Sequence, residues 1–277
     1  MALDPIDLPL LIEAEQLEPL LGHPQLLIVD LSAIQFYMRC HVPGAIYLSF
    51  SELMRSEKPI LGLLPTQEQL TTLFSSIGLT PDTHVVAYDG EGGGWAGRLL
   101  WTLDVIGHKR YSYLNGGIHA WAKRKMELQS EEMIPTPTDY QVTLDLTASV
   151  DKQYLLDNLN RDDLVIWDAR SLAEHTGEKM LAARAGHMPG AAHYEWTQAM
   201  DQMDALRIRD LDTVRAELAK IGISGDKEIV THCQSHHRSA FTYLLGRILG
   251  FKNIKAYPGS WSEWGNDPDT PIELSDI

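Results

Sequence analysis

The segment Val230–Phe241, with the sequence VTHCQSHHRSAF, concentrates side chains that can do chemistry. It contains Cys233, one of the two cysteines of the chain, together with three histidines and Arg238. Such a thiol can be a nucleophile, a metal ligand or a buried structural cysteine. A free thiol with a pKa near ~8.5 is mostly protonated at neutral pH, whereas helix ends and neighbouring cations can lower the pKa to about 3.5–7.5. The composition of the segment favours an activated nucleophile.

The residues on either side of Cys233 predict where the thiol lies in a fold. Ile229–Thr231 is a short apolar run typical of a buried parallel strand, and Ala240–Leu249 is apolar on nearly all sides, as a buried helix is. Ligands of open α/β sheets bind beyond the carboxyl ends of the strands. We expect the loop after the strand to curl its backbone N–H groups into an anion-binding nest at the helix N-terminus. The candidate anion-binding residues are Gln234, Ser235, His236, His237, Arg238 and Ser239.

Two other interpretations of the cysteine are open. A buried structural thiol is the commonest state of a free cysteine, although the cluster of histidines and arginine is unusual in an acidic protein. A metal site is disfavoured because adjacent residues at a strand end, such as His232 and Cys233, point to opposite sides. Structural zinc sites draw ligand pairs from separated segments, and no second CxxC or HxxxH motif is present. We expect no metal and no cofactor.

Composition limits the partners and the compartment. The 277 residues are 44% hydrophobic and carry a net charge of −15, which argues against nucleic acid and anionic membranes as partners. No apolar run is long enough to predict a membrane span. The first 21 residues contain no basic residue, so they do not resemble a secretion signal. Two cysteines fit a reducing compartment, and we expect the cytoplasm.

The chain contains an internal repeat. Motifs in the first half return about 140 residues later, which indicates duplicated domains. The matched pairs are Leu26–Ser32 with Leu164–Ser171, His41–Leu48 with His187–Tyr194, and Ile77–Asp89 with Ile221–Cys233. Strand-like runs alternate with helical patterns such as Gln67–Ile77 and Leu211–Ile221, which predicts an α/β fold with a mainly parallel sheet flanked by helices in each half. We expect domains at 1–130 and 148–277, joined by a polar linker at 131–147.

These features together resemble the rhodanese (thiosulfate sulfurtransferase) family. The resemblance is carried by DARS at Asp168–Ser171, HMPGA at His187–Ala191, the cysteine loop and GSWSEW at Gly259–Trp264. The CQSHHR loop is similar to that of a bacterial subtype. The resemblance implies two tandem rhodanese-like domains, of which the first is inactive because Asp89 takes the position of Cys233. The glycine-rich segment DGEGGGWAGR, which begins with Asp89, could also be a dinucleotide fingerprint, but the repeat favours a degenerate active-site loop.

The resemblance also implies a reaction. The Cys233 thiolate would take the outer sulfur of thiosulfate, release sulfite, and pass the sulfur from a persulfide to cyanide, a thiol or a protein acceptor. His236, His237 and Arg238 could hold the anionic donor, unless the two histidines form a solvated loop tip. Trp196 and Arg170 are candidates for the pocket, although core packing is open for Trp196 and a structural pair with Asp168 or Glu174 for Arg170. We expect Glu174 and His175 to form a solvated helix start, and the protein to be a monomer.

Three alternatives remain at this stage. A persulfide-carrying sulfur-relay protein would load Cys233 but pass the sulfur only to a protein partner. A cysteine phosphatase would have five residues between cysteine and arginine, whereas four residues separate Cys233 from Arg238. A mercaptopyruvate sulfurtransferase would carry a CGSGVT loop, which this chain lacks.

Overall fold

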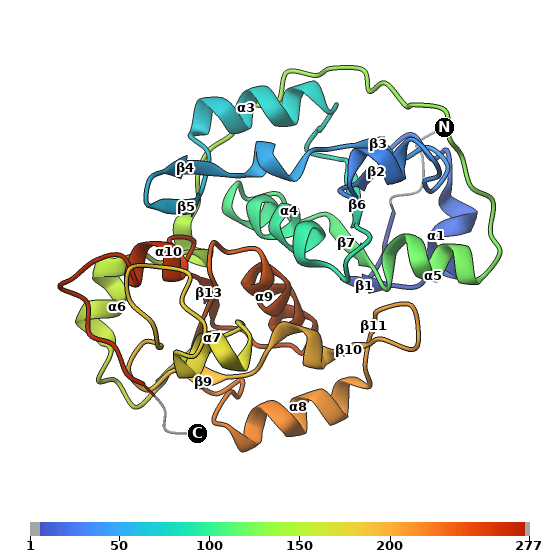
Figure 1. Cartoon of the computed structure of the whole chain (residues 1–277). Coiled ribbons are helices and arrows are strands. Elements are labelled where there is room, and N and C mark those ends of the chain that lie inside the picture. Colours follow the sequence, from blue (N-terminus) through green and yellow to red (C-terminus); the bar gives the residue numbers. More distant parts are fainter. Residues whose placement is uncertain (1–5, 275–277) are drawn as a thin grey trace. The chain divides into compact units, whose positions relative to one another are not determined.

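The structure is a computed structural model that describes residues 6–274. It divides into two compact units (Figure 1). The first contains the residues up to Leu53, Pro65–Asp145 and Asp201–Ile208. The second contains Met54–Leu64, Leu146–Met200 and the residues from Arg209 onward.

The first unit is built on a parallel sheet with the strand order β1-β7-β6-β2-β3. The strands are β1 (Leu11–Ile12), β2 (Leu26–Asp30), β3 (Ile46–Tyr47), β6 (His84–Tyr88) and β7 (Tyr111–Leu114). The helices are α1 (Ala14–Leu17), α2 (Ile34–Tyr37), α3 (Gln67–Ser76), α4 (Gly94–Val105) and α5 (Gly117–Lys123), with 3-10 turns η1 (Glu18–Leu20) and η2 (Phe50–Leu53). Ile28, Val86 and Trp121 lie in its buried core. Every residue of β6 is buried, as expected for a central parallel strand.

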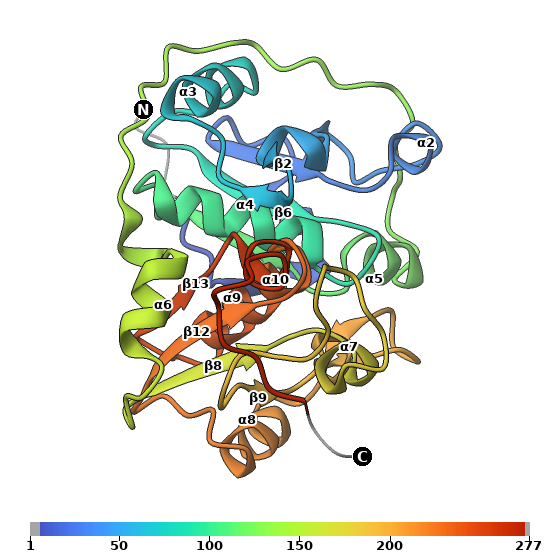
Figure 2. The same ribbon diagram turned by 60° about the vertical axis from the view of Figure 1, so that its left-hand side comes forward.

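The second unit has a parallel sheet with the order β13-β12-β8-β9 (Figure 2). The strands are β8 (Leu164–Asp168), β9 (Ala192–His193), β12 (Glu228–His232) and β13 (Ile254–Ala256). The helices are α6 (Lys152–Asn158), α7 (Leu172–Thr176), α8 (Leu211–Lys220), α9 (Arg238–Ile248) and α10 (Ser260–Trp264), with 3-10 turns η3 (Leu146–Ala148) and η4 (Trp196–Ala199). Leu155 of α6 and the two tryptophans of α10 share a buried core with Ile166 and Val230 of the sheet.

Local sequence explains where the helices begin. The side chain of Asp210 accepts a hydrogen bond from the Thr213 N–H at the start of α8. Thr66 and Ser171 form capping boxes with residues three positions later, at the starts of α3 and α7. The predicted α/β class, the parallel sheets and the duplication are confirmed. The helices predicted at Gln67–Ile77 and Leu211–Ile221 correspond to α3 and α8.

Two two-stranded pairs lie outside these sheets, and the β4–β5 pair is antiparallel. The hairpin of β4 (Arg55–Glu57) and β5 (Ile60–Leu63) belongs to the second unit, although it comes from the first half of the sequence. β10 (Met200–Asp201) and β11 (Arg207–Ile208) lie at the edge of the 201–208 segment of the first unit. The sequence-based division at 131–147 did not anticipate these two segments, because nothing in their composition distinguishes them from their neighbours. Within residues 6–274, no helix has the length and apolarity needed to span a membrane.

Candidate active site

The loop that contains Cys233 connects β12 to α9, at the carboxyl end of the sheet. Cys233 is fully buried, and the hydroxyl of Ser239 donates to Sγ at 3.4 Å. Burial raises the pKa of the thiol, but Arg238, the Ser239 hydroxyl and the backbone N–H groups of Ser239 and Ser235 outweigh it and lower the pKa to about 7. A large fraction of this thiol is therefore ionised at neutral pH. Cys233 is buried, yet it lies among hydrogen-bond donors and not in a purely apolar core.

The backbone of the loop is held from outside by α10. Trp261 donates its N–H to the carbonyl of Cys233 at 2.9 Å, and Ser262 donates to the carbonyl of Gln234 at 2.9 Å. The Cys233 N–H donates to Ser260 Oγ at 3.3 Å, and that hydroxyl donates to the Tyr257 carbonyl. These contacts turn successive carbonyl groups away from the sulfur, so that N–H groups can face it.

Arg238 is held by Glu174 of α7. The two side chains form a bidentate ion pair with N–O distances of 2.6 and 2.9 Å, and the side chain of Glu174 is only 3% exposed. Burial raises the pKa of Glu174, but the pairing with Arg238 and hydrogen bonds from Ser171 lower it to about 2. The expectation that Glu174 and His175 form a solvated helix start is therefore wrong. Both are buried, because Glu174 pairs with Arg238 and His175 binds the carboxylate of Asp168.

Asp168, at the end of β8, organises the neighbouring charges. Its carboxylate accepts hydrogen bonds from Arg170 and from His175 Nδ1, which lies 2.9 Å away. Although burial raises the pKa of Asp168, His232 and Arg170 hold it well below its ordinary value. Burial lowers the pKa of His232 to about 4, so this histidine is neutral at pH 7. His232 therefore adds no positive charge beside the thiol.

The side chains of Arg170 and His236 are both buried and hydrogen-bonded within the protein. Arg170 is 1% exposed, binds Asp168 and the Gly186 carbonyl, and stacks on the ring of Trp261 at 4.3 Å. His236 is buried, with Nδ1 2.8 Å from Ser239 Oγ. When the Ser239 hydroxyl donates to Sγ, His236 Nδ1–H donates to that hydroxyl.

His237 and Trp196 lie beside each other at the loop. Their ring centroids are 5.6 Å apart, and both side chains are half-buried. Trp196 also packs edge-on against Phe241 of α9. Gln234 donates from Nε2 to the Leu181 carbonyl at 3.1 Å, which ties the loop to the segment after α7. Of the predicted residues, His237 and Trp196 have ring faces near the loop surface, whereas the Arg170 guanidinium is occupied by buried partners.

The loop of the first unit shows the same nest with a different occupant. Asp89 follows β6, and its carboxylate accepts five backbone N–H bonds. The donors are Glu91, Gly92, Gly93, Trp95 and Ala96, at distances of 2.8–3.1 Å. A nest whose donors are already bound to an internal carboxylate has no room for an external anion.

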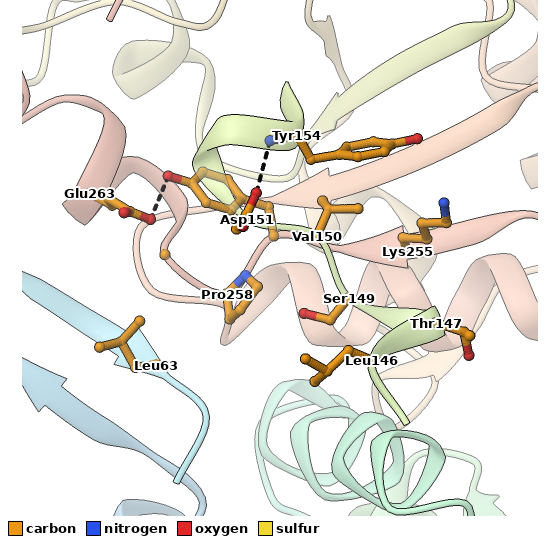
Figure 3. Close-up of a pocket in the computed structure, with 12 residues that line it drawn as sticks. Leu63, Leu146, Thr147, Ser149, Val150, Asp151, Tyr154, Lys255, Pro258 and Glu263 are labelled. Carbon is orange, nitrogen blue, oxygen red and sulfur yellow. Dashed lines mark hydrogen bonds between the residues drawn. The ribbon is translucent and has the colours of Figure 1, made fainter. Parts of the chain in front are cut away.

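No cluster of metal-ligating side chains occurs among residues 6–274. The second unit also contains a pocket of about 470 Å³, shown in Figure 3. Its lining comes from β5, η3, α6 and the 255–263 segment, and it includes Leu63, Tyr154, Lys255 and Pro258. It contains none of the residues of the Cys233 loop. The pocket and the Cys233 loop are therefore separate features of the second unit.

The sequence-based interpretation missed three groups that shape the loop. The Ser171–Glu174 pattern was visible as a capping box, but its partner Arg238 is distant in sequence. Ser260 and Ser262 lie within the GSWSEW segment, whose contacts with the loop carry no sequence signal other than that motif. Gly62 contacts the loop from the first half of the chain, and nothing in the sequence indicated that contact.

Comparisons with known proteins agree with this geometry. Residues 13–124 and 151–267 each match the Rhodanese-like domain family. The chain therefore belongs to the family of proteins with rhodanese-like domains, and it contains two copies.

Two relatives match over nearly their whole length. A thiosulfate sulfurtransferase of Azotobacter vinelandii is 50% identical over 271 residues, which cover 96% of this chain and 98% of the relative. A thiosulfate sulfurtransferase of Pseudomonas aeruginosa is 48% identical over 269 residues, covering 97% and 98%. Among solved structures, the anaerobic ergothioneine biosynthesis enzyme of Chlorobium limicola has a TM-score of 0.86 at 21% identity, covering 97% of this chain and 71% of that one. This last similarity is one of fold.

Proposed function

We propose that the protein is an enzyme that transfers the outer sulfur of thiosulfate to a thiophilic acceptor through a persulfide on Cys233. The observation that carries the proposal is the thiol itself. It is held among backbone N–H groups, the Ser239 hydroxyl and Arg238, and its pKa is about 7. The two relatives named thiosulfate sulfurtransferase, at 48% and 50% identity, support thiosulfate as the donor.

The first half-reaction loads the enzyme. The Cys233 thiolate attacks the outer sulfur of thiosulfate, a new S–S bond forms, and the S–S bond of the donor breaks. Sulfite leaves with the electron pair, and Cys233 carries a persulfide anion. The reaction needs no separate oxidant or reductant, because the transferred sulfur is already bonded to another sulfur in thiosulfate and sulfite leaves with the electron pair of that bond. The covalent intermediate divides the transfer into two displacements.

The second half-reaction removes the transferred sulfur from Cys233. A nucleophilic acceptor such as cyanide attacks the terminal sulfur, the S–S bond of the persulfide breaks, and the thiolate of Cys233 is restored. Thiocyanate is the product when cyanide is the acceptor. The negative charge stays in the loop throughout, so the same preorganised N–H donors stabilise thiolate, transition states and persulfide without reorganisation.

The anionic donor needs a local positive site in a protein with a net charge of −15. His237, beside Trp196 at the loop surface, is our first candidate to contact the sulfonate. Arg238 supplies charge from behind the loop, while its hydrogen bonds go to Glu174. His236 acts through Ser239, and Gln234, Ser235 and Ser239 contribute to the cradle. Arg170 supports the site from the buried side.

The Arg238–Glu174 pair also weighs against a phosphatase. A cysteine phosphatase needs its arginine to bind the phosphate, whereas the donors of Arg238 that face Glu174 are in a bidentate pair. The CQSHHR loop fits the bacterial subtype of thiosulfate sulfurtransferases. We further propose that the protein works as a monomer in the reducing cytoplasm, which keeps a nucleophilic thiol free, and that a protein thiol can serve as acceptor.

The mass of the intact protein tests this function. After incubation with thiosulfate, the wild-type chain should gain one sulfur, and cyanide should remove it with formation of thiocyanate. Cys233→Ser should abolish both steps, because a serine hydroxyl is not ionised at neutral pH. Cys40→Ser, which removes the other cysteine, is the matched control and should behave as wild type. Sulfur that loads on the Cys233→Ser variant would contradict the assigned nucleophile. A persulfide that forms but resists cyanide would instead indicate a sulfur-relay protein.

A further inference from the structure

The β4–β5 hairpin contacts the active-site loop through its backbone. Leu61 of β5 donates its N–H to Ser262 Oγ at 3.1 Å. Gly62, the next residue, is buried, and a Cβ placed there would lie less than 3.0 Å from the carbonyl oxygens of both Ser235 and Pro258. Real Cβ atoms essentially never come this close to such atoms. Gly62 is not one of the glycines with a positive φ. Glycine is therefore required at this position by the lack of space for a Cβ and not by the backbone conformation.

Three successive carbonyl groups of the loop are therefore held from outside, two by α10 and one by β5. The Cys233 carbonyl accepts from Trp261, the Gln234 carbonyl accepts from Ser262, and the Ser235 carbonyl packs on Gly62. In a trans peptide, the C=O and the N–H of the following residue point in opposite directions. Holding the Gln234 carbonyl outward thus turns the Ser235 N–H inward, and this N–H is one of the groups that lower the pKa of the thiol.

The next peptide has little freedom to move. It joins Ser235 to His236, and His236 has a φ of 52°, in the left-handed region that residues other than glycine rarely adopt. His236 in turn holds Ser239, which donates to the sulfur. A displacement of the Ser235 carbonyl would rotate this peptide. The rotation would move the Ser235 N–H, which precedes the peptide, and the His236–Ser239 contact, which follows it.

We propose that Gly62 is a positioning residue for sulfur transfer. It lets β5 lie directly against the Ser235 carbonyl, and the hairpin thereby keeps the N–H groups of the loop directed at the sulfur. A hairpin from the catalytically inactive half of the sequence thus completes the active site of the other half. This inference rests on the proposed persulfide chemistry of Cys233, but its primary test measures the thiol without any sulfur donor.

The test compares Gly62→Ala with wild type, both in a Cys40→Ser background so that only Cys233 reacts. The pH profile of alkylation by iodoacetamide gives the midpoint of thiol ionisation. A Cβ at Gly62 must displace the Ser235 carbonyl or the hairpin, so we expect the midpoint to rise by about one pH unit. The thiolate fraction at pH 7 would then fall about fivefold. The pH profile of kcat/KM with thiosulfate should shift in the same direction.

Two further variants separate positioning from general stability. Ser56→Ala removes the hydrogen bond from Ser56 Oγ to the Leu61 carbonyl, at 3.0 Å within the same hairpin, and leaves Gly62 in place. It should keep the wild-type midpoint even if the hairpin is less stable. Ser262→Ala removes the acceptor of the Leu61 N–H but keeps the Ser262 N–H that binds Gln234. It should raise the midpoint by less than Gly62→Ala does.

The outcomes are distinct. A raised midpoint in folded Gly62→Ala, with Ser56→Ala unchanged, supports the proposal. A wild-type midpoint in Gly62→Ala overturns it, and if that variant does not fold, a wild-type midpoint in Ser262→Ala overturns it. If wild-type Cys233 acquires no sulfur from thiosulfate, the proposed function fails instead, whatever the variants show in the alkylation assay.

Discussion

The bidentate pair between Arg238 and Glu174 affects both the stability of the fold and the ionisation of Cys233, and one set of variants can separate the two effects. It stabilises the fold by satisfying a buried carboxylate, and it holds a positive charge near the Cys233 sulfur. Arg238→Met keeps much of the length and apolar stem of the side chain but removes the charge. The variant should damage both functions, and replacing Glu174 as well should restore only the first.

The stability effect can be estimated from burial. Removing one partner of a buried ion pair typically costs 3–5 kcal/mol, and because the Arg238 side chain is 19% exposed we expect about 2–3 kcal/mol. The double variant Arg238→Met/Glu174→Gln has no uncompensated charge and should recover most of this loss. Arg215→Met is a suitable control, because Arg215 forms a surface pair with Asp212 and should cost no more than ~0.5 kcal/mol. Urea denaturation of wild type and these three variants measures the differences.

The thiol effect should not recover. Arg238 is the first of the groups that lower the pKa of Cys233 to about 7, so without it burial should raise the midpoint of alkylation to about 8 or above. Because a thiolate of higher pKa is also intrinsically more reactive, the rate at one pH would understate the change, and the full pH profile is needed. A midpoint that stays near 7 in Arg238→Met, or that returns to 7 in the double variant, would refute the separate electrostatic role.

Three other predictions concern Glu174 and Asp89. The folded-state pKa of Glu174 is depressed from 4.5 to about 2, so its contribution, about 3 kcal/mol at most, is present above pH 4.5 and lost as the pH falls toward 2. The pH dependence of unfolding should therefore be shallower over this range in the double variant than in wild type. Asp89→Asn turns an amide NH₂ toward N–H donors and should cost about 3 kcal/mol in urea denaturation, whereas exposed Asp82→Asn should cost almost nothing; equal values would show that the five bonds to Asp89 are weak. Asp89→Cys should acquire no sulfur from thiosulfate, because no arginine is placed in its loop as Arg238 is; a mass gain on a Cys233→Ser background would disprove this.

The sequence predicted those parts of the site that follow from local pattern and from the repeat. The apolar run before Cys233 and the apolar helix after it place the thiol at a strand end, and the match of Ile77–Asp89 with Ile221–Cys233 places Asp89 at the equivalent point. Both follow from short segments whose periodicity is set by burial on two faces. The parallel sheets and the duplicated α/β fold follow from the same patterns.

The sequence did not predict the contacts that join distant segments. Ser171–Glu174 has the pattern of an exposed capping box, and only the tertiary structure brings Arg238 to Glu174 and buries it. His232 was counted as a cation, but burial makes it neutral at pH 7. Gly62 could be read as an ordinary turn or strand glycine, because the requirement for it comes from the carbonyl groups of Ser235 and Pro258.

The carboxylate of Asp89 gives the loop of the first unit a permanent ligand. Its five hydrogen bonds are the ones that a visiting anion would otherwise make, but this anion is part of the chain and cannot leave. The loop of the first unit is therefore occupied at all times. In the reaction proposed above, the loop of Cys233 alternates instead between a bare and a sulfur-loaded state, and its carbonyl groups are held from outside by α10 and β5.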